Sequence, residues 1–192
     1  NRSAQKWLII GTITSLPLGM VLPYCQVYAA EVKGADVTVL AAMVTAAALT
    51  SVEFGYPVGA LADKIGRKKI LYITMSLFAL SNILLVFAPS PFFLILAGAF
   101  QGFYYIGSPL AATIQRELVS SEVMGRWIGI NRFVTSILGA AMAFVGGVIY
   151  DQLGPAYVFL IIVGMDLFIR LPLLISIPET LHAPVPANHV DS

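Results

Sequence analysis

The chain has 192 residues, of which 58% are hydrophobic and 11% are charged. A soluble domain of ordinary composition carries about 25% charged residues, and a chain this short cannot bury so much apolar surface when water surrounds it. The composition therefore excludes a soluble globular domain and a disordered chain, and it predicts a polytopic membrane protein. The formal net charge of +1 gives no basic field that would attract nucleic acid, and the single cysteine, Cys25, excludes an intrachain disulfide.

Six apolar stretches are long enough to cross a bilayer, which takes about 17–25 residues per helix. In chain order they are residues 7–30, 37–62, 70–88, 91–114, 127–150 and 155–177. The apolar runs are continuous rather than alternating, which favours helices over a barrel. We therefore predict an all-α, six-helix transmembrane domain over residues 1–181, followed by a polar cytoplasmic tail at 182–192. Because the chain begins with Asn1 rather than methionine, we interpret it as a processed or excised piece.

The positive charges are distributed unevenly between the predicted loops. Nine Lys and Arg residues lie before the first span, between the second and third, or around the connection from the fourth to the fifth, whereas only Lys33 lies on the other side. Cytoplasmic loops carry an excess of Lys and Arg. The asymmetry predicts a multi-pass protein of the cell membrane with both termini in the cytoplasm. The eleventh cation, Arg170, lies inside the last span.

A short pattern, Gly-x-x-x-Asp-x-x-Gly, ends both the second and the fifth span. It covers residues 59–66 and 147–154, so the two copies are 88 residues, or three helices, apart. Because three is odd, the copies must face opposite sides of the membrane. We interpret the chain as two inverted three-helix repeats, an arrangement found in secondary transporters. The alternative is a chance similarity between two glycine-rich helix ends.

The first spans of these two repeats, residues 7–30 and 91–114, are both expected to be interrupted by glycine and proline. Interrupted helices in corresponding positions indicate a substrate cavity. The candidate cavity residues are the polar side chains on these two spans, namely Tyr24, Gln26, Gln101, Tyr104, Tyr105 and Ser108. The alternative is that the small residues allow close helix packing and the tyrosines belong to the interfacial belt, where we expect Tyr28 to lie.

The segment Gly59-Ala-Leu-Ala-Asp63-Lys64-Ile-Gly66-Arg67-Lys68-Lys69 resembles the signature loop of the major facilitator superfamily, which joins the second and third helices of a six-helix half. Residues 117–126, 139–151 and 178–180 are similar to the start of that family's fifth helix, its glycine-rich fifth or eleventh helix, and the end of its sixth or twelfth helix. The resemblance implies one half of a secondary active transporter for a small solute, with the other six-helix half as its partner.

The signature loop is usually stronger in the N-terminal half of that family, which favours that half, but two other features are typical of the C-terminal half of a prokaryotic member. Gly98 stands where the family's fourth helix often carries an arginine, which speaks against a proton-coupling role at that position. The polar tail at 182–192 resembles a chain end.

The signature loop supplies candidate gating residues. Gly59 and Gly66 are expected to let helices approach and the chain turn sharply. Asp63 is expected to accept hydrogen bonds from the N-terminus of the fifth helix, and Arg67 to pair with Glu117 or Glu122. Such contacts would form a latch that opens when the transporter rocks. The alternative is a plain cationic loop that sets the topology, which is the role expected of Lys68 and Lys69.

Three charges lie within the predicted spans. Glu53 lies ten residues before Asp63, about 15 Å deeper along the same helix, and is expected to be either a proton-coupling carboxylate or a permanently hydrogen-bonded acid. Asp166 and Arg170 are four residues apart, where opposite charges on a helix meet. We expect them to form a self-compensating pair, with a substrate or proton-coupling role as the alternative. Near the start of the fifth span, Arg132 is expected to snorkel to the cytoplasm or to attract an anionic substrate.

Rival functions are a membrane enzyme and a non-transporting scaffold, channel-like subunit or self-associating half, which would form a homodimer. No phosphate-binding Gly-x-x-x-x-Gly-Lys-[Ser/Thr] motif is present, which disfavours a nucleotide-driven pump. His182 and His189 both lie in the tail, so no intramembrane Ser–His pair is available, and no His or Cys cluster suggests zinc. We therefore expect no catalytic residue, metal or cofactor.

Overall fold

The structure is a computed structural model that describes residues 19–118 and 123–172. These residues are almost entirely helical and contain no strand. The elements are α2 (Tyr24–Glu31), α3 (Val37–Ile65), α4 (Arg67–Phe87), α5 (Pro91–Leu118), α6 (Met124–Gln152), α7 (Pro155–Met165) and a π-helical turn, η2 (Asp166–Arg170). Helices α3, α4, α6 and the Pro91–Leu110 part of α5 are long and apolar enough to cross a membrane. The all-α membrane fold is therefore confirmed.

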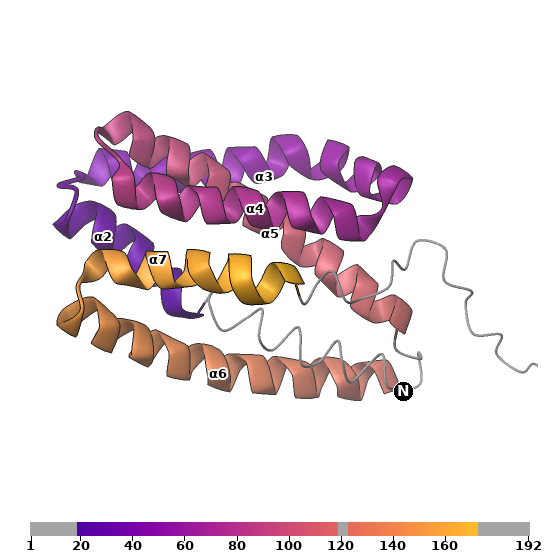
Figure 1. The fold of residues 1–192 in the computed structure, drawn as a ribbon. Coiled ribbons are helices and arrows are strands. Elements are labelled where there is room, and N and C mark those ends of the chain that lie inside the picture. Colours follow the sequence, from indigo (N-terminus) through magenta and orange to yellow (C-terminus); the bar gives the residue numbers. More distant parts are fainter. Residues whose placement is uncertain (1–18, 119–122, 173–192) are drawn as a thin grey trace, which may run out of the picture.

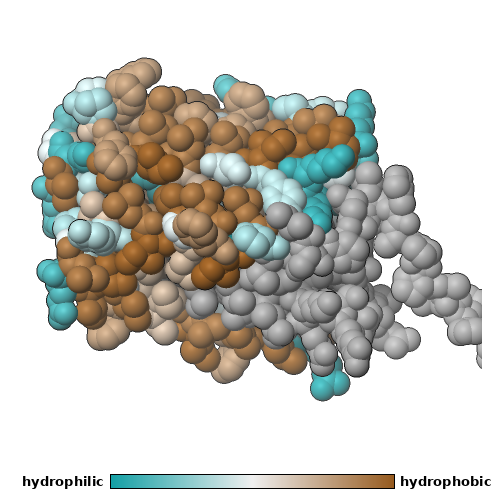
Figure 2. Space-filling model, viewed as in Figure 1, coloured by the Kyte–Doolittle hydropathy of each residue, from teal (hydrophilic) through white to brown (hydrophobic). Residues whose placement is uncertain are grey.

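The helices run side by side, and their connections alternate between two ends of the bundle (Figure 1). The α3–α4 turn, the end of α5 and the start of α6 lie at one end, whereas the α2–α3, α4–α5 and α6–α7 connections lie at the other. On the face shown in Figure 2, hydrophobic residues cover most of the middle of the bundle and hydrophilic residues gather towards its ends. This distribution suits a protein whose middle lies in lipid.

Single residues determine where several helices begin. The side chain of Asp36 accepts a hydrogen bond of 2.8 Å from the backbone N–H of Val39, which caps the start of α3. Gly66 has a φ of 112° and reverses the chain in one residue, so that α4 begins at Arg67 rather than at the predicted Ile70. Gly154, with a φ of 117°, does the same before α7. Hydropathy places the start of α4 three residues too late because the first turn of this helix is charged, whereas α3 and α7 begin at the predicted residues, Val37 and Pro155.

The first span is broken, as predicted, but the fourth is not. Residues 19–21 are helical, a turn follows at Leu22 and Pro23, and α2 begins at Tyr24. In contrast, α5 continues through three glycines and Pro109, so the predicted interruption of this helix is wrong. Its glycines serve packing instead. A Cβ atom on Gly98 or Gly102 would come within 2.8 Å of Met43 Cα or Thr50 Cβ of α3, so at these two positions the helices lie too close together for α5 to carry a side chain.

A second close crossing joins the first helix to α6. A Cβ atom on Gly19 would come within 2.7 Å of the Cα atom of Gly139. The apolar core lies between these two crossings and is formed by side chains such as Met20, Val21, Met43, Phe78, Leu94 and Phe159, each exposed by 2% or less. The first helix packs on α6, and α5 packs on α3. Each set of three consecutive helices therefore places its glycine-containing first helix against the middle helix of the other set.

Candidate functional site

The short helix α2 carries Tyr24, which is directed towards α6. Its hydroxyl donates a hydrogen bond of 2.7 Å to the backbone carbonyl of Ala143. Its ring stacks on Tyr150, with 5.5 Å between the ring centroids. The ring can lie so close to α6 because Gly147 has no side chain, and a Cβ there would come within 2.8 Å of the Tyr24 hydroxyl. Tyr24 therefore joins the segment after the break in the first helix to α6.

Gln101 of α5 and Cys25 of α2 meet across the bundle. The amide nitrogen of Gln101 lies 3.6 Å from the Cys25 sulfur, which accepts its hydrogen bond. Cys25 is buried, with 5% of its surface exposed, whereas Gln101 and the neighbouring Gln26 are half-buried. This contact places polar atoms of both candidate cavity helices next to each other, directly beyond the break at Pro23.

The remaining candidate cavity residues lie further along α5. Tyr104 is half-buried, and its ring contacts Phe78 of α4 at 5.4 Å and the neighbouring Tyr105 at 5.5 Å between centroids. Half of the surface of Tyr105 is exposed, and Ser108 is exposed as well. The six predicted residues therefore do not all face one space: Tyr24 faces α6, Tyr104 packs on α4, and Tyr105 and Ser108 lie at the surface.

The turn between α3 and α4 contains an internal ion pair that the sequence analysis did not predict. The guanidinium of Arg67 donates from Nη2 at 3.2 Å and from Nε at 3.3 Å to the same oxygen, Oδ1 of Asp63. The side chain of Asp63 is 66% exposed and that of Arg67 only 18% exposed. Spacing of four residues across a helix end is a signal that could have revealed this pair.

The structure describes some of the other contacts that were predicted for the signature loop. Gly66 makes the sharp turn that was predicted for it, and its N–H donates to the carbonyl of Ala62 at 3.1 Å. A Cβ atom on Gly59 would meet nothing within 4 Å, so no described helix approaches it closely. Lys68 is half-buried at the start of α4. The side chains of Glu117 and Glu122 lie outside the described residues, so their pairing with Arg67 stays a prediction.

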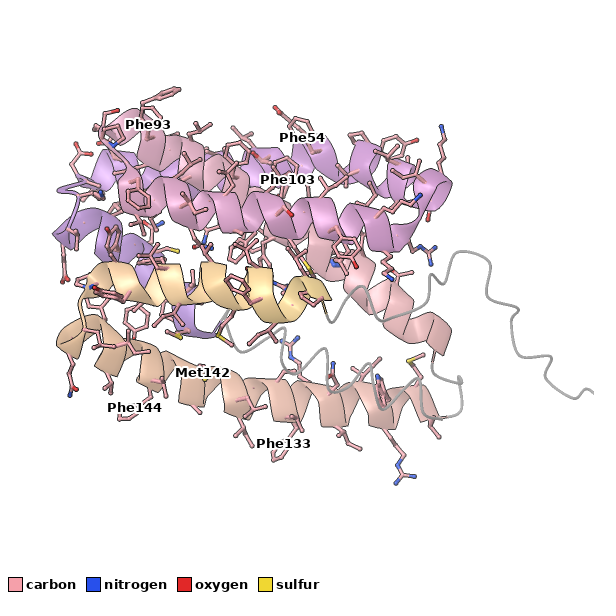
Figure 3. All side chains as sticks on the ribbon, viewed as in Figure 1. Phe54, Phe93, Phe103, Phe133, Met142 and Phe144 are labelled. Carbon is pink, nitrogen blue, oxygen red and sulfur yellow. The ribbon has the colours of Figure 1, made fainter. Side chains whose placement is uncertain are left out.

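The intramembrane charges have contrasting surroundings. Asp166 and Arg170 form the predicted pair, with Arg170 Nη1 donating to Asp166 Oδ1 at 3.1 Å, and their side chains are 3% and 8% exposed. Glu53, in contrast, lies on the exposed face of α3, and Arg132 lies on the exposed face of α6. In Figure 3, Phe133 and Phe144 of α6 also project away from the other helices. The outward faces of α3 and α6 thus combine large apolar groups with charges.

Polar contacts also join the elements at the end of the bundle opposite the α3–α4 turn, and hydropathy gave no sign of them. The Tyr150 hydroxyl donates to Glu31 Oε2 at 3.3 Å, and Lys33 Nζ donates to the carbonyl of Ala88 at 3.3 Å. Tyr28, predicted for the interfacial belt, is instead 2% exposed. Its ring lies edge-on to Phe159 at 4.9 Å, and its hydroxyl is 3.5 Å from the carbonyl of Val86, which satisfies the phenol away from the surface.

Within residues 19–118 and 123–172, no three His, Cys, Asp or Glu side chains come together in a way that could hold a metal ion. Of the polar contacts described above, those of Tyr24, Gln101 and Tyr150 join different helices, whereas Asp166 and Arg170 pair within one helical turn.

Comparison with known proteins agrees with this description. The family model of the Major Facilitator Superfamily matches residues 7–189. The chain is also 29% identical over 151 residues to the inner membrane transport protein YajR of Escherichia coli (strain K12), an alignment that covers 76% of this chain and 32% of YajR. The chain thus aligns with about a third of the length of this relative.

Proposed function

Because the chain belongs to the Major Facilitator Superfamily, we propose that it forms one six-helix half of a secondary transporter that moves a small solute by alternating access. The observation that carries this proposal is the break in the first helix at Leu22 and Pro23, with Gln101 of the fourth helix bonded to Cys25 just beyond it. Broken helices beside polar groups near the middle of the membrane are how many transporters build a substrate site. The polar cavity would then comprise Tyr24, Gln26, Gln101, Tyr104, Tyr105 and Ser108.

Two helix crossings support the inverted repeat. The first helix touches α6 at Gly19 and Gly139, and α5 touches α3 at Gly98 and Gly102. In a chain of two inverted three-helix units, a contact between the first and fifth helices has its counterpart between the fourth and second. Glycine crossings at both places are what such a repeat requires, and they provide two surfaces on which the units can slide.

The missing half explains why α3 and α6 expose charges within the membrane. A carboxylate such as Glu53 that faces hydrocarbon is costly, and the same holds for Arg132 of α6. A second six-helix half packed on these faces would cover both residues or place them in a water-filled cavity. The alignment with only 32% of YajR leaves room for such a half. We assign Glu53 to proton coupling, and we interpret Asp166 with Arg170 primarily as a structural pair.

The α3–α4 turn is the proposed gate. The end of the bundle that carries this turn also carries most of the cations, so we place it, together with both chain termini, in the cytoplasm of the cell. The Asp63–Arg67 pair and the one-residue turn at Gly66 hold the loop in a defined shape from which Lys68 and Arg67 can contact neighbouring helices. Loss of the Asp63 charge should then change the balance between outward-open and inward-open states rather than the fold.

The experiment is solute uptake into proteoliposomes that contain the complete transporter. A panel of solutes is added with and without a pH gradient, and a pH-sensitive dye inside the vesicles reports the accompanying movement of protons. Glu53→Gln should abolish gradient-driven uptake while exchange of solute at equal pH persists. Asp63→Asn should lower the rate of both. The matched control is Asp36→Asn, at the opposite end of α3, which keeps a good N-cap and should leave uptake unchanged. Undiminished gradient-driven uptake by Glu53→Gln would remove the coupling assignment.

A self-associating half is the second candidate, favoured by the same exposed faces of α3 and α6. Two copies related by a twofold axis could cover one another's Glu53 and Arg132. The mass of the protein in detergent, measured by light scattering with correction for bound detergent, distinguishes the cases. A dimer of this chain would support self-association, whereas a monomer supports pairing with a different half.

A further inference from the structure

The short helix α2 (Tyr24–Glu31) is bounded by a break in the backbone at each end. On its N-terminal side is the turn at Leu22 and Pro23, and Pro23 has no backbone N–H with which to continue the preceding helix. On its C-terminal side the chain is not helical again until Val37, and it passes through Gly34 with a φ of 67°. Non-helical positions of this kind absorb the φ and ψ changes of a hinge. The backbone therefore allows α2 to move as one unit.

Side chains hold α2 in place, because a helix of eight residues is too short to be stable alone. Its buried face carries Cys25, Tyr28 and Ala29. Behind this face, the amide of Gln101 of α5 donates its hydrogen bond to the Cys25 sulfur. Val27, on the other face of α2, is exposed. A single helix thus separates the contact between Cys25 and Gln101 from the surroundings of the protein.

On one side, α2 is fastened to α6 by Tyr150. The Tyr150 ring stacks on Tyr24 at the start of α2, with 5.5 Å between the centroids. Its hydroxyl donates to Oε2 of Glu31 at the end of α2, at 3.3 Å. Glu31 is exposed, so water can compete for this bond. We call the hydrogen bond between Tyr150 and Glu31 the α6 latch.

On the other side, the turn that follows α2 is fastened to the end of α4 by Lys33. Nζ of Lys33 donates to the carbonyl of Ala88, the C-cap residue of α4, at 3.3 Å. A cation is favourable at this end of a helix, where the carbonyls lack partners within the helix. The same ammonium lies 5.9 Å from the centre of the Tyr28 ring. We call the hydrogen bond between Lys33 and Ala88 the α4 latch.

We propose that α2 is a hinged lid, which the α6 latch and the α4 latch hold closed at the end of the bundle where α6 ends and α7 begins (Figure 1). When the latches open, α2 swings about Pro23 and Gly34, carries Cys25 away from Gln101, and admits water between them. Every part of this device lies within the described residues of one chain. The inference therefore goes beyond the transport proposal and does not depend on it.

Cys25 is the only cysteine of the chain and reports the opening directly. The full chain in lipid nanodiscs is treated with a water-soluble, positively charged methanethiosulfonate, and the rate at which Cys25 is modified is followed by the mass of the intact protein. Cys25→Ser combined with Val27→Cys moves the thiol to the exposed face of α2 and gives the rate for an uncovered thiol. Cys25 should react at least about tenfold more slowly than this reference, through local opening of α2.

Variants of the two latches test the mechanism. Tyr150→Phe keeps the ring and removes the donor, and Glu31→Ala removes the acceptor. Each should raise the rate at Cys25 at least about threefold, and the two together no further than either one, because they break the same bond. Glu31→Gln keeps an acceptor oxygen and should leave the rate as it is. Lys33→Met breaks the α4 latch, and its effect should multiply with that of Tyr150→Phe. An unchanged rate in both Tyr150→Phe and Lys33→Met would overturn the proposal.

A second reporter distinguishes a moving lid from a bundle that loosens everywhere. Ala47→Cys in the Cys25→Ser background places a thiol between α3 and α5, where Ala47 is 6% exposed and Cys25 is 5% exposed. The latch variants should leave the rate at this position unchanged. Tyr157→Phe removes an exposed hydroxyl of α7 at the same end of the bundle and should alter neither rate. If the latch variants accelerate both reporters equally, α2 does not move by itself and the lid is refuted.

Discussion

Removing one partner of the buried Asp166–Arg170 pair should destabilise the protein far more than removing both. The side chains are 3% and 8% exposed, so neither charge can reach water without a rearrangement of α7. Removing one partner of such a pair leaves an uncompensated charge, which costs about 3–5 kcal/mol. Replacement of the whole pair by apolar side chains of similar volume is often neutral or better. Asp166→Leu and Arg170→Met should therefore each cost about 3–5 kcal/mol, and the double variant about 0–1 kcal/mol.

The lone cysteine provides the assay. Cys25 is buried and free, so a thiol-reactive fluorescent dye labels it only when the bundle opens. The apparent Tm in detergent can then be read from the rise in fluorescence. For a chain of this size, about 2–4 °C corresponds to 1 kcal/mol, so each single variant should lower Tm by about 6–20 °C. The double variant should lie within about 4 °C of the unaltered protein.

The coupling energy between Asp166 and Arg170 shows whether the two charges compensate each other. It is the effect of the double variant minus the sum of the two single effects. If the two charges compensate each other, its magnitude should be at least about 5 kcal/mol, with a sign that offsets the single losses. Ser76→Ala is a suitable control, because Ser76 of α4 lines the same pocket as Asp166 and Arg170 and its replacement removes a polar group without altering charge. If the single effects simply add, the two charges do not compensate each other and the structural interpretation of the pair is refuted.

Three further predictions concern glycine packing and the first helix. Gly66→Ala should cost about 1–3 kcal/mol, because φ at this position is 112° and only glycine adopts such a conformation without strain; the same dye assay measures it. Gly102→Leu should be destabilising by about 1–3 kcal/mol or more, because its Cβ would meet Thr50 of α3 at 2.8 Å. Gly59→Ala in α3 meets nothing within 4 Å and improves helix propensity by about 1 kcal/mol, so it should leave Tm unchanged or raise it by up to about 4 °C. Tyr24→Phe removes a 2.7 Å hydrogen bond to α6 and should cost about 1 kcal/mol, with the label reaching Cys25 faster below Tm; an unchanged labelling rate would show that this bond does not hold the first helix closed.

The helices could be predicted from the sequence because lipid leaves the backbone little choice. With no water to satisfy its N–H and C=O groups, an apolar run of sufficient length must be helical, and α3 begins at Val37 as the sequence indicated. Hydropathy places helix ends less well. The Arg67-Lys68-Lys69 run was assigned to a loop, yet it forms the first turn of α4, because Gly66 alone completes the reversal.

The roles of the glycines in α5 could not be predicted in the same way. A glycine within an apolar run is compatible with a break, because it lowers helix propensity, and with close packing, because it lacks a Cβ. Which of the two occurs depends on the helix opposite, and here the backbone of α3 at Met43 fills the space beside Gly98. Proline is no clearer a signal: the first helix breaks at Pro23, but α3 continues through Pro57 and α5 through Pro109, although each proline removes a backbone donor.

The sequence also does not determine towards which side of its helix a charged side chain points. This orientation decides how the charges within the spans are interpreted. Asp166 and Arg170 are separated by one turn and compensate each other, so their pairing follows from spacing alone. Glu53 has no such local partner, and its depth in the membrane could be estimated while the face on which it lies could not. The structure places it on the exposed face of α3. A permanently hydrogen-bonded acid inside this half is therefore disfavoured. What remains is a group whose partner, solvent or proton comes from outside the described parts of these helices, and that is the condition a coupling carboxylate at the boundary between two halves must meet.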